Sequence, residues 1–286
     1  MIGVIDQVLE VLGGGIFREK GLPEYGRQDL GYSPGGALDL FSLSSGNILL
    51  GNDASAPGLE IVVPPRLRFR ENCCFVFTGG RWEAVLTDSR GGDLQPVEHA
   101  RVYQAHPGSV LEFRRRVYGF RTYLCWRKTP RRAGRIVGRR RGPFREVCRW
   151  LDAEGRIRVI PGPEYRCLSD PESFFETRWQ ISVDSSDMGL RLRSPRRFPG
   201  ETGMISAPVN DGTIQLSPDG PVVLLRDRQT VGGYPRILNV ISADLDLLAQ
   251  YGPLEYLRFQ PTNLQEAGEA ARIKRRDLKR LHRRFR

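Results

Sequence analysis

The feature that most constrains the fold of this chain is a series of short runs rich in β-branched and aromatic residues, each closed by a turn. The turns carry Gly, Pro and Asp, as in TGGR (78–81) and SPDGP (217–221). Many short strands at such spacing are typical of β-barrels and β-sandwiches. We therefore predict a mostly β protein, with strands at LEIVV (59–63), CCFVF (73–77), WEAVLT (82–87), RTYLCW (121–126), IRVI (157–160), WQISV (179–183), GTIQL (212–216), PVVLL (221–225) and RILNVI (236–241).

Helical patterns are fewer. Asp39 could cap a helix over residues 39–52, and Ser242 could cap another over 242–250, with Gly252 just past its end. Residues 263–285 are predicted to form one amphipathic and strongly basic helix. The stretch 128–149 mixes Pro, Gly and Arg without periodicity, which indicates a loop or linker. The chain is thus expected to comprise four segments: an N-terminal β domain (1–127), a basic linker (128–156), a C-terminal β domain (157–262) and a basic tail (263–286).

The formal net charge of +11 is concentrated in two short segments. Residues 128–149 hold nine Lys or Arg and one Glu, a net +8, and residues 273–286 hold eight Lys or Arg and one Asp, a net +7. Subtracting both from the total leaves −4, so the body of the protein is mildly acidic. The interleaved aromatic residues on which single-stranded nucleic acids stack are almost absent from both segments. We expect solvated charge runs rather than a nucleic-acid site.

Length and composition indicate a globular protein. At 286 residues, 40% of them apolar, the chain can bury a substantial core in one large or two medium domains. No apolar run approaches the roughly 20 residues that span a bilayer. The first fifteen residues, MIGVIDQVLEVLGGG, lack the basic start of a secretory signal, so a cytoplasmic protein is expected. The five cysteines form no C-x-x-C pair and are interpreted as reduced thiols.

Several familiar catalytic motifs do not fit. Residues 31–35 (GYSPG) match G-x-S-x-G, but Ser33 is followed by Pro34, which has no N–H to donate to an oxyanion. No G-x-x-x-x-G-K-[ST] sequence is present, so ATP is not expected to bind through a P-loop. Three histidines, His99, His106 and His282, are too few for a multi-histidine metal centre. We predict no metal or cofactor on this chain, and catalysis must use carboxylates, amides, hydroxyls and backbone N–H groups.

The candidate site is the stretch DRQTVGGYP (227–235), which joins two predicted strands. Asp227 could orient or deprotonate a substrate, and Gln229 and Thr230 could hold both edges of a small amide. Gly232 and Gly233 permit positive φ and close backbone approach to a ligand, and their N–H groups could bind developing negative charge. The same residues also suit a tight connection between two strands, in which Asp227 only hydrogen-bonds to its own turn. The stretch alone does not decide between a binding site and such a turn.

The surroundings of this stretch resemble a known family. DRQTVGGYPRILNVISADLDLLAQ (227–250) is similar to the D-x-Q-T-x-G-G-Y-P block, apolar strand and D-L-x-x-L-A-Q helix of allophanate hydrolase subunit 2, the C subunit of 5-oxoprolinase and the carboxyltransferase region of urea carboxylase. Further similarities cover most of the chain to about residue 260: GYSPGGALD (31–39), N-x-L-x-G-N (47–52), TGG (78–80), RTYLCW (121–126) and DGTIQLSPDGPVVLL (211–225).

The resemblance implies two cyclophilin-like β-barrel domains and a companion subunit 1, itself cyclophilin-like. It implies a complex that, together with a third, LamB-type subunit, uses ATP to open the lactam of 5-oxoproline. The chain alone would then be inactive. Tyr234 belongs to the implied substrate site, with Asp39 and Asn47 as contributors from the other half of the chain. A urea- or allophanate-type activity and a non-catalytic interaction protein of the same fold remain as alternatives.

Three polar positions depart from the family pattern. Gly35 stands where the S-G-A-M-D block has serine, and Asp187 stands where S-D-R-M-G has arginine. Ala207 replaces the glutamate of S-E-G-V. These changes predict a diverged member with an altered substrate or a mainly partner-binding role.

Overall fold

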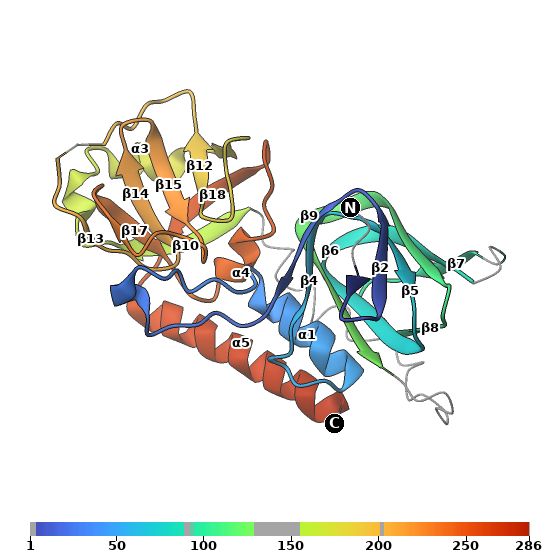
Figure 1. Ribbon diagram of the computed structural model, residues 1–286. Helices are drawn as coiled ribbons and strands as arrows, with labels where there is room; N and C mark the ends of the chain where they lie inside the picture. The colour runs from blue at the N-terminus through green and yellow to red at the C-terminus, as the bar shows by residue number, and fades with distance from the viewer. Residues whose placement is uncertain (1–3, 89–91, 93, 129–154, 201–202, 286) are drawn as a thin grey trace. The chain divides into compact units, whose positions relative to one another are not determined.

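The computed structural model describes residues 4–88, 92, 94–128, 155–200 and 203–285 (Figure 1). These form two compact units: the first comprises Met1–Gly21, Leu40–Leu151 and Asp277–Arg286, and the second comprises Leu22–Asp39 and Asp152–Arg276. The grouping differs from the segments expected from the sequence, because Leu22–Asp39 joins the second unit rather than the first and the basic tail is divided between both. Of the predicted linker 128–156, only Lys128, Gly155 and Arg156 lie within the described residues.

The first unit is built on a nine-stranded sheet. Two long strands form its spine, β6 (Cys73–Thr87) and β9 (Val110–Lys128), which pair antiparallel. The register shifts between Gly79 and Arg81, an irregularity of the kind that lets a sheet curve. The remaining strands are β1 (Val4–Ile5), β2 (Leu9–Gly13), β3 (Ile16–Lys20), β4 (Gly58–Val63), β5 (Arg66–Phe69), β7 (Leu94–Val97) and β8 (Tyr103–Ala105).

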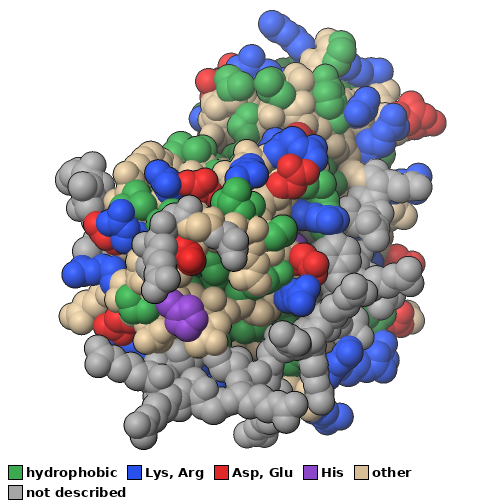
Figure 2. Space-filling model, turned by 90° about the vertical axis from the view of Figure 1, so that its right-hand side faces the viewer, with side chains coloured by type: hydrophobic (Ala, Val, Ile, Leu, Met, Phe, Trp, Pro, Cys, Tyr) green, Lys and Arg blue, Asp and Glu red, His purple; other side chains and the backbone are tan. Residues whose placement is uncertain are grey.

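The interior of the first unit is aromatic and aliphatic. Phe69, Phe75 and Phe77 are fully buried, and the rings of Phe69 and Phe75 lie 4.9 Å apart. Outside, ion pairs such as Arg68–Glu10 (3.2 Å) and Lys128–Glu71 (3.4 Å) join exposed side chains. Figure 2 shows basic and acidic side chains interspersed in this way across one face of the molecule. Pairs this exposed contribute about 0–1 kcal/mol each, so the apolar core stabilises the unit.

The second unit contains a closed barrel of seven strands. Around the barrel the order is β10 (Arg156–Pro161), β17 (Arg236–Val240), β14 (Thr213–Ser217), β15 (Gly220–Leu224), β12 (Gly189–Arg193), β11 (Trp179–Ile181) and β18 (Tyr256–Pro261). Closure comes from the parallel pairing of β10 with β18. The tight turn between β14 and β15 uses Gly220 at φ +119°, and Ser217 Oγ donates to Gly220 O at 2.8 Å. The mostly β fold predicted from the sequence is confirmed.

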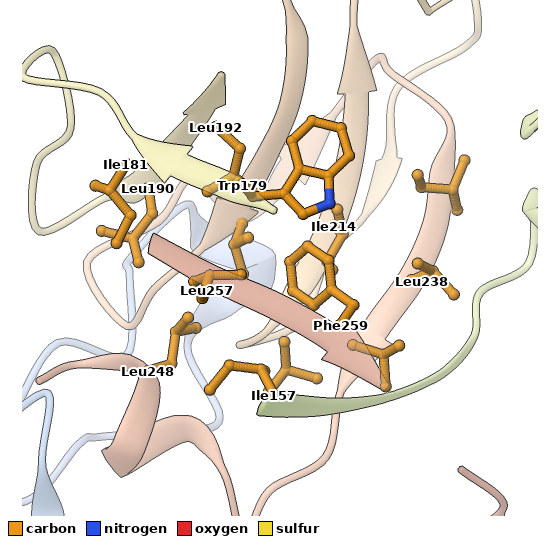
Figure 3. Packing of buried hydrophobic residues seen from close by; sticks show 14 of the residues in the cluster. Ile157, Trp179, Ile181, Leu190, Leu192, Ile214, Leu238, Leu248, Leu257 and Phe259 are labelled. Carbon is orange, nitrogen blue, oxygen red and sulfur yellow. The ribbon is translucent and has the colours of Figure 1, made fainter. Parts of the chain in front are cut away.

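The barrel is filled by side chains from every wall (Figure 3). Trp179 is 1% exposed, and its indole N–H donates to Phe174 O at 3.2 Å, which satisfies the one polar atom of the ring. Phe174 packs on Trp179, Phe198 and Phe259 at centroid distances of 4.8, 5.5 and 5.7 Å. Aromatic packing of this density makes the barrel a rigid support for the loops at its ends.

The short helices lie close to where the sequence placed them. Helix α1 (Leu40–Leu50) begins directly after Asp39 and is buried almost throughout. The helix expected over 242–250 is shorter, α4 (Leu245–Leu248), and its N-cap is Asp244 rather than Ser242. Asp244 is held by a bidentate pair with Arg158, at 3.0 and 2.6 Å. The remaining short elements are η1 (Gln28–Leu30), η2 (Tyr165–Cys167), α3 (Pro171–Glu176), and the two-residue strands β13 (Ala207–Pro208) and β16 (Val231–Gly232).

The C-terminal helix α5 (Leu264–Phe285) forms as predicted, but it is not a solvated tail. Asn263 Oδ1 caps its start by accepting from Glu266 N at 3.0 Å. Ala270 is 6% exposed and packs with Ile241 and Ala243, and Leu281 is 2% exposed. The expectation of a solvated charge run is therefore wrong, because the helix buries Ala270 and Leu281. Within the described residues, no helix is long and apolar enough to cross a membrane.

Candidate functional site

The candidate site loop, residues 227–235, connects β15 to β17 at one end of the barrel in the second unit. The loop is short and well anchored: β16 pairs antiparallel with β13, and Val209 N donates to Thr230 O at 3.1 Å. Asp227 is partly buried, whereas Gln229 and Tyr234 are exposed, Tyr234 to 40%. The structure thus presents a carboxylate, an amide and a phenol from one rigid connection.

The loop meets a second segment from far away in the chain. Gly35 N donates to Arg226 O at 3.1 Å, and Ser33 Oγ donates to Arg228 O at 2.6 Å. A β-carbon on Gly35 would lie 3.8 Å from Asp227 Oδ1 and would meet nothing else within 4 Å. Two of the sequence blocks that carry the family resemblance, 31–39 and 227–235, therefore come together beside the Asp227 carboxylate.

Buried charged side chains underlie this junction. Arg226 and Arg228 are 6% and 3% exposed, and both point at Asp211: Arg228 Nε lies 2.9 Å from Asp211 Oδ1, and Arg226 Nε lies 3.9 Å from Asp211 Oδ2. Tyr25 OH donates to Asp211 Oδ2 at 2.6 Å. Partial burial and this hydrogen bond raise the pKa of Tyr25, so its hydroxyl stays protonated and keeps donating. Sequence reasoning missed these four residues, although the arginines flank Asp227 directly.

The glycines of the loop serve close packing rather than unusual backbone angles. Neither Gly232 nor Gly233 has positive φ, contrary to the sequence interpretation. A β-carbon on Gly232 would lie 2.5 Å from Nε2 of Gln215, a 2%-exposed residue on β14. Gln215 Nε2 donates to Tyr234 O at 3.1 Å, and Gln215 Oε1 accepts from Gln229 Nε2 at 3.3 Å. Gln215 is thus a further missed residue, and it orients Gln229.

The two contributors expected from the other half of the chain, Asp39 and Asn47, belong to different compact units. Asp39 belongs to the second unit, is 4% exposed, and accepts from Gln250 Nε2 at 2.6 Å. Asn47 belongs to the first unit, where its Nδ2 donates to Ala56 O at 2.7 Å and its Oδ1 accepts from Asn52 at 3.1 Å. Both side chains make buried structural hydrogen bonds where they stand.

Two of the three positions that depart from the family pattern, Gly35 and Ala207, border the candidate loop. Gly35 faces Asp227, and Ala207 pairs with Gly232 in the β13–β16 ladder. Asp187 precedes Met188, whose carbonyl accepts from Leu225 N at 3.0 Å. Gly35 and Ala207 lie far apart in the sequence, yet both border this loop.

The side chains at the site can both accept and donate hydrogen bonds. A carboxylate accepts hydrogen bonds, and each glutamine amide offers one acceptor and two donors.

Across the described ranges no group of three His, Cys, Asp or Glu side chains is arranged to hold a metal ion. Burial raises the pKa of Cys73 and Cys125 to about 12, so these thiols stay protonated at neutral pH. Cys148 lies outside the described residues.

Comparison with known proteins gives consistent similarities over most of the chain. Residues 30–131 and 139–261 match the family described as carboxyltransferase domain, subdomain A and B. The chain is 31% identical to the C subunit of 5-oxoprolinase from Haemophilus influenzae, covering 88% of this chain and 90% of that protein. It is also 31% identical to the corresponding C subunit from Escherichia coli, covering 90% of this chain and 92% of that one.

A solved structure supports the fold. The crystal structure of the K. lactis urea amidolyase superposes with a TM-score of 0.80 at 18% identity, covering 96% of this chain. The chain spans only 20% of that much longer protein, so this likeness concerns the fold of one region.

Proposed function

We propose that this chain, which belongs to the carboxyltransferase domain family of subdomains A and B, is the C subunit of a 5-oxoprolinase-type complex. In this role it contributes a small-amide site and binds a companion subunit 1, together with a LamB-type third subunit. The complex opens the lactam of 5-oxoproline in a reaction driven by ATP. The observation that carries the proposal is the meeting of residues 31–39 with 227–235 at Asp227.

The proposed roles follow from what each group can donate or accept. The Asp227 carboxylate accepts the lactam N–H, and it orients or deprotonates the amide. Gln229 is held by Gln215, which directs its amide group while leaving a second N–H to donate to a carbonyl oxygen. Thr230 adds a hydroxyl beside it. Backbone N–H groups at Gly232 and Gly233 stabilise negative charge that develops on that oxygen.

A urea- or allophanate-type reaction on the same fold is the second candidate. It is favoured by one observation, the placement of Gly35 and Ala207 beside the loop, since changes at a substrate site alter which amide is accepted. A non-catalytic interaction protein of the same fold is the remaining candidate, and it predicts partner binding without turnover.

Reconstitution tests the proposal. The chain is co-expressed with its companion subunit 1, and the third subunit is added to the purified pair. We expect the chain to co-elute with subunit 1, and phosphate release from ATP to require 5-oxoproline and all three proteins. Turnover with urea in place of 5-oxoproline supports the second candidate, and co-elution without any turnover supports the interaction protein. Failure to co-elute contradicts the complex itself.

A further inference from the structure

Five charged side chains form a buried line of alternating charge in the second unit. Their order is Lys274, Asp246, Arg226, Asp211 and Arg228. The exposed fractions of these side chains are 14%, 6%, 7%, 8% and 3%. Lys274 comes from α5 and Asp246 from α4, while Arg226 and Arg228 flank Asp227. A residue of the basic helix is thus linked through buried charges to the candidate loop.

Arg226 is the branch point of this line. Its Nη1 donates to the carbonyl oxygens of Ala37 (3.2 Å) and Leu38. Its Nη2 lies 3.5 Å from Asp246 Oδ1, and its Nε lies 3.9 Å from Asp211 Oδ2. The backbone oxygen of Arg226 also accepts from Gly35 N. One residue therefore fixes the 35–38 segment against the loop through both its side chain and its backbone.

Asp246 and that segment contact different nitrogens of the same Arg226 guanidinium, Nη2 and Nη1 respectively. Lys274 Nζ pairs with Asp246 Oδ2 and also donates to Ala243 O at 3.0 Å. Removing the Lys274 charge leaves the Asp246 carboxylate less neutralised, so its attraction for Arg226 grows, because little water is present to screen it. Without Lys274, Arg226 would be drawn toward Asp246 and away from the Ala37 and Leu38 carbonyls.

We propose that Lys274 is a positioning residue: by neutralising Asp246, it frees Arg226 to hold the 35–38 segment beside Asp227. The basic C-terminal helix thereby sets the geometry of the candidate site without contacting it. The proposal concerns the structure of this chain, and its consequence for turnover rests on the function proposed above.

Hydrogen exchange of the full chain tests the positioning directly. We expect Lys274→Met to speed exchange of amides in residues 31–39, including Gly35, about tenfold relative to the barrel strands, because local opening becomes easier. Lys274→Arg, which keeps a cation near Asp246, should stay close to wild type. Arg275→Met is the matched control, since it removes one exposed charge from the neighbouring position of the same helix.

The double variant Lys274→Met/Asp246→Asn separates positioning from simple helix docking. Removing both charges leaves no carboxylate at position 246 to draw Arg226 away from the Ala37 and Leu38 carbonyls. Amide exchange in residues 31–39 should therefore return toward the wild-type rate. Unchanged exchange in Lys274→Met, or a double variant that exchanges as fast as the single one, overturns the proposal.

In the reconstituted complex, Lys274→Met should raise KM for the amide substrate more than it lowers kcat. Lys274→Arg should keep KM close to the wild-type value. An inactive wild-type complex would contradict the proposed function and leave the exchange result to decide this inference.

Discussion

Replacing Gly232 by Ala tests whether the candidate loop depends on the close approach of Gln215. The new β-carbon would lie 2.5 Å from Gln215 Nε2 and 3.0 Å from Oε1, so the buried amide must move. Its movement removes the hydrogen bonds to Tyr234 O and from Gln229, at 3.1 and 3.3 Å. At about 0.5–1.5 kcal/mol for each hydrogen bond, the loss is roughly 1–3 kcal/mol. Because Gly232 does not have positive φ, no backbone strain adds to this figure.

Gly233→Ala is the matched control. Its β-carbon would lie 3.3 Å from Met204 O and 3.5 Å from Ser206 Oγ, contacts that small shifts relieve. Urea unfolding of both variants, followed by far-UV circular dichroism, should show a free energy of unfolding lower by about 1–3 kcal/mol for Gly232→Ala and by under about 1 kcal/mol for Gly233→Ala. Equal stability of the two variants would refute the role assigned to Gln215.

Three further substitutions have defined outcomes. Gly35→Ser should lower the free energy of urea unfolding by about 1–2 kcal/mol, because Gly35 has φ +61°. The variant should still fold, since the new β-carbon meets only Asp227 Oδ1, at 3.8 Å, and a variant as stable as wild type would contradict the left-handed backbone. Leu281→Ala should lower the free energy of unfolding by about 2–5 kcal/mol, whereas Leu264→Ala, at a 76%-exposed position, should stay within about 0.5 kcal/mol. Burial lowers the pKa of His99 to about 4, so the unfolded chain binds this proton at a higher pH than the folded chain does. The free energy of unfolding should therefore fall by up to ~3 kcal/mol as the pH drops from 6.5 to 4, and urea titrations of His99→Gln should show a smaller fall.

The positions of strands and helices could be predicted from the local sequence pattern. The packing of the basic C-terminal helix against the rest of the protein could not. The barrel strands 157–160, 179–183 and 212–216 were predictable because alternation and turn residues specify them locally. The basic tail was predictable as an amphipathic helix, but the partners of its apolar side chains were not. Leu281 lies among basic residues, and the local pattern does not say which part of the fold covers it.

The candidate residues were selected from the sequence by their chemistry, whereas the side chains that support them were not recognised. The loop residues 227–235 stood out by their chemistry, whereas Gln215 resembled any polar residue on a strand. Asp211 and Tyr25 carry no local signal, because Asp211 pairs with Arg228, 17 residues away, and with Tyr25, 186 residues away. Gly232 was noticed for a backbone freedom that it does not use, since a glycine required for close packing looks the same in sequence as one required for positive φ.

The central claim, that Asp227 serves an amide site within a 5-oxoprolinase-type complex, is tested most directly by 5-oxoproline-dependent phosphate release from the three-protein complex. The measurement compares wild type, Asp227→Asn and the control Asp219→Asn, whose side chain is exposed on the β14–β15 turn. The account predicts that Asp227→Asn still folds and co-elutes with subunit 1 but loses phosphate release, while Asp219→Asn retains it. A folded, co-eluting Asp227→Asn complex with wild-type phosphate release would contradict the claim.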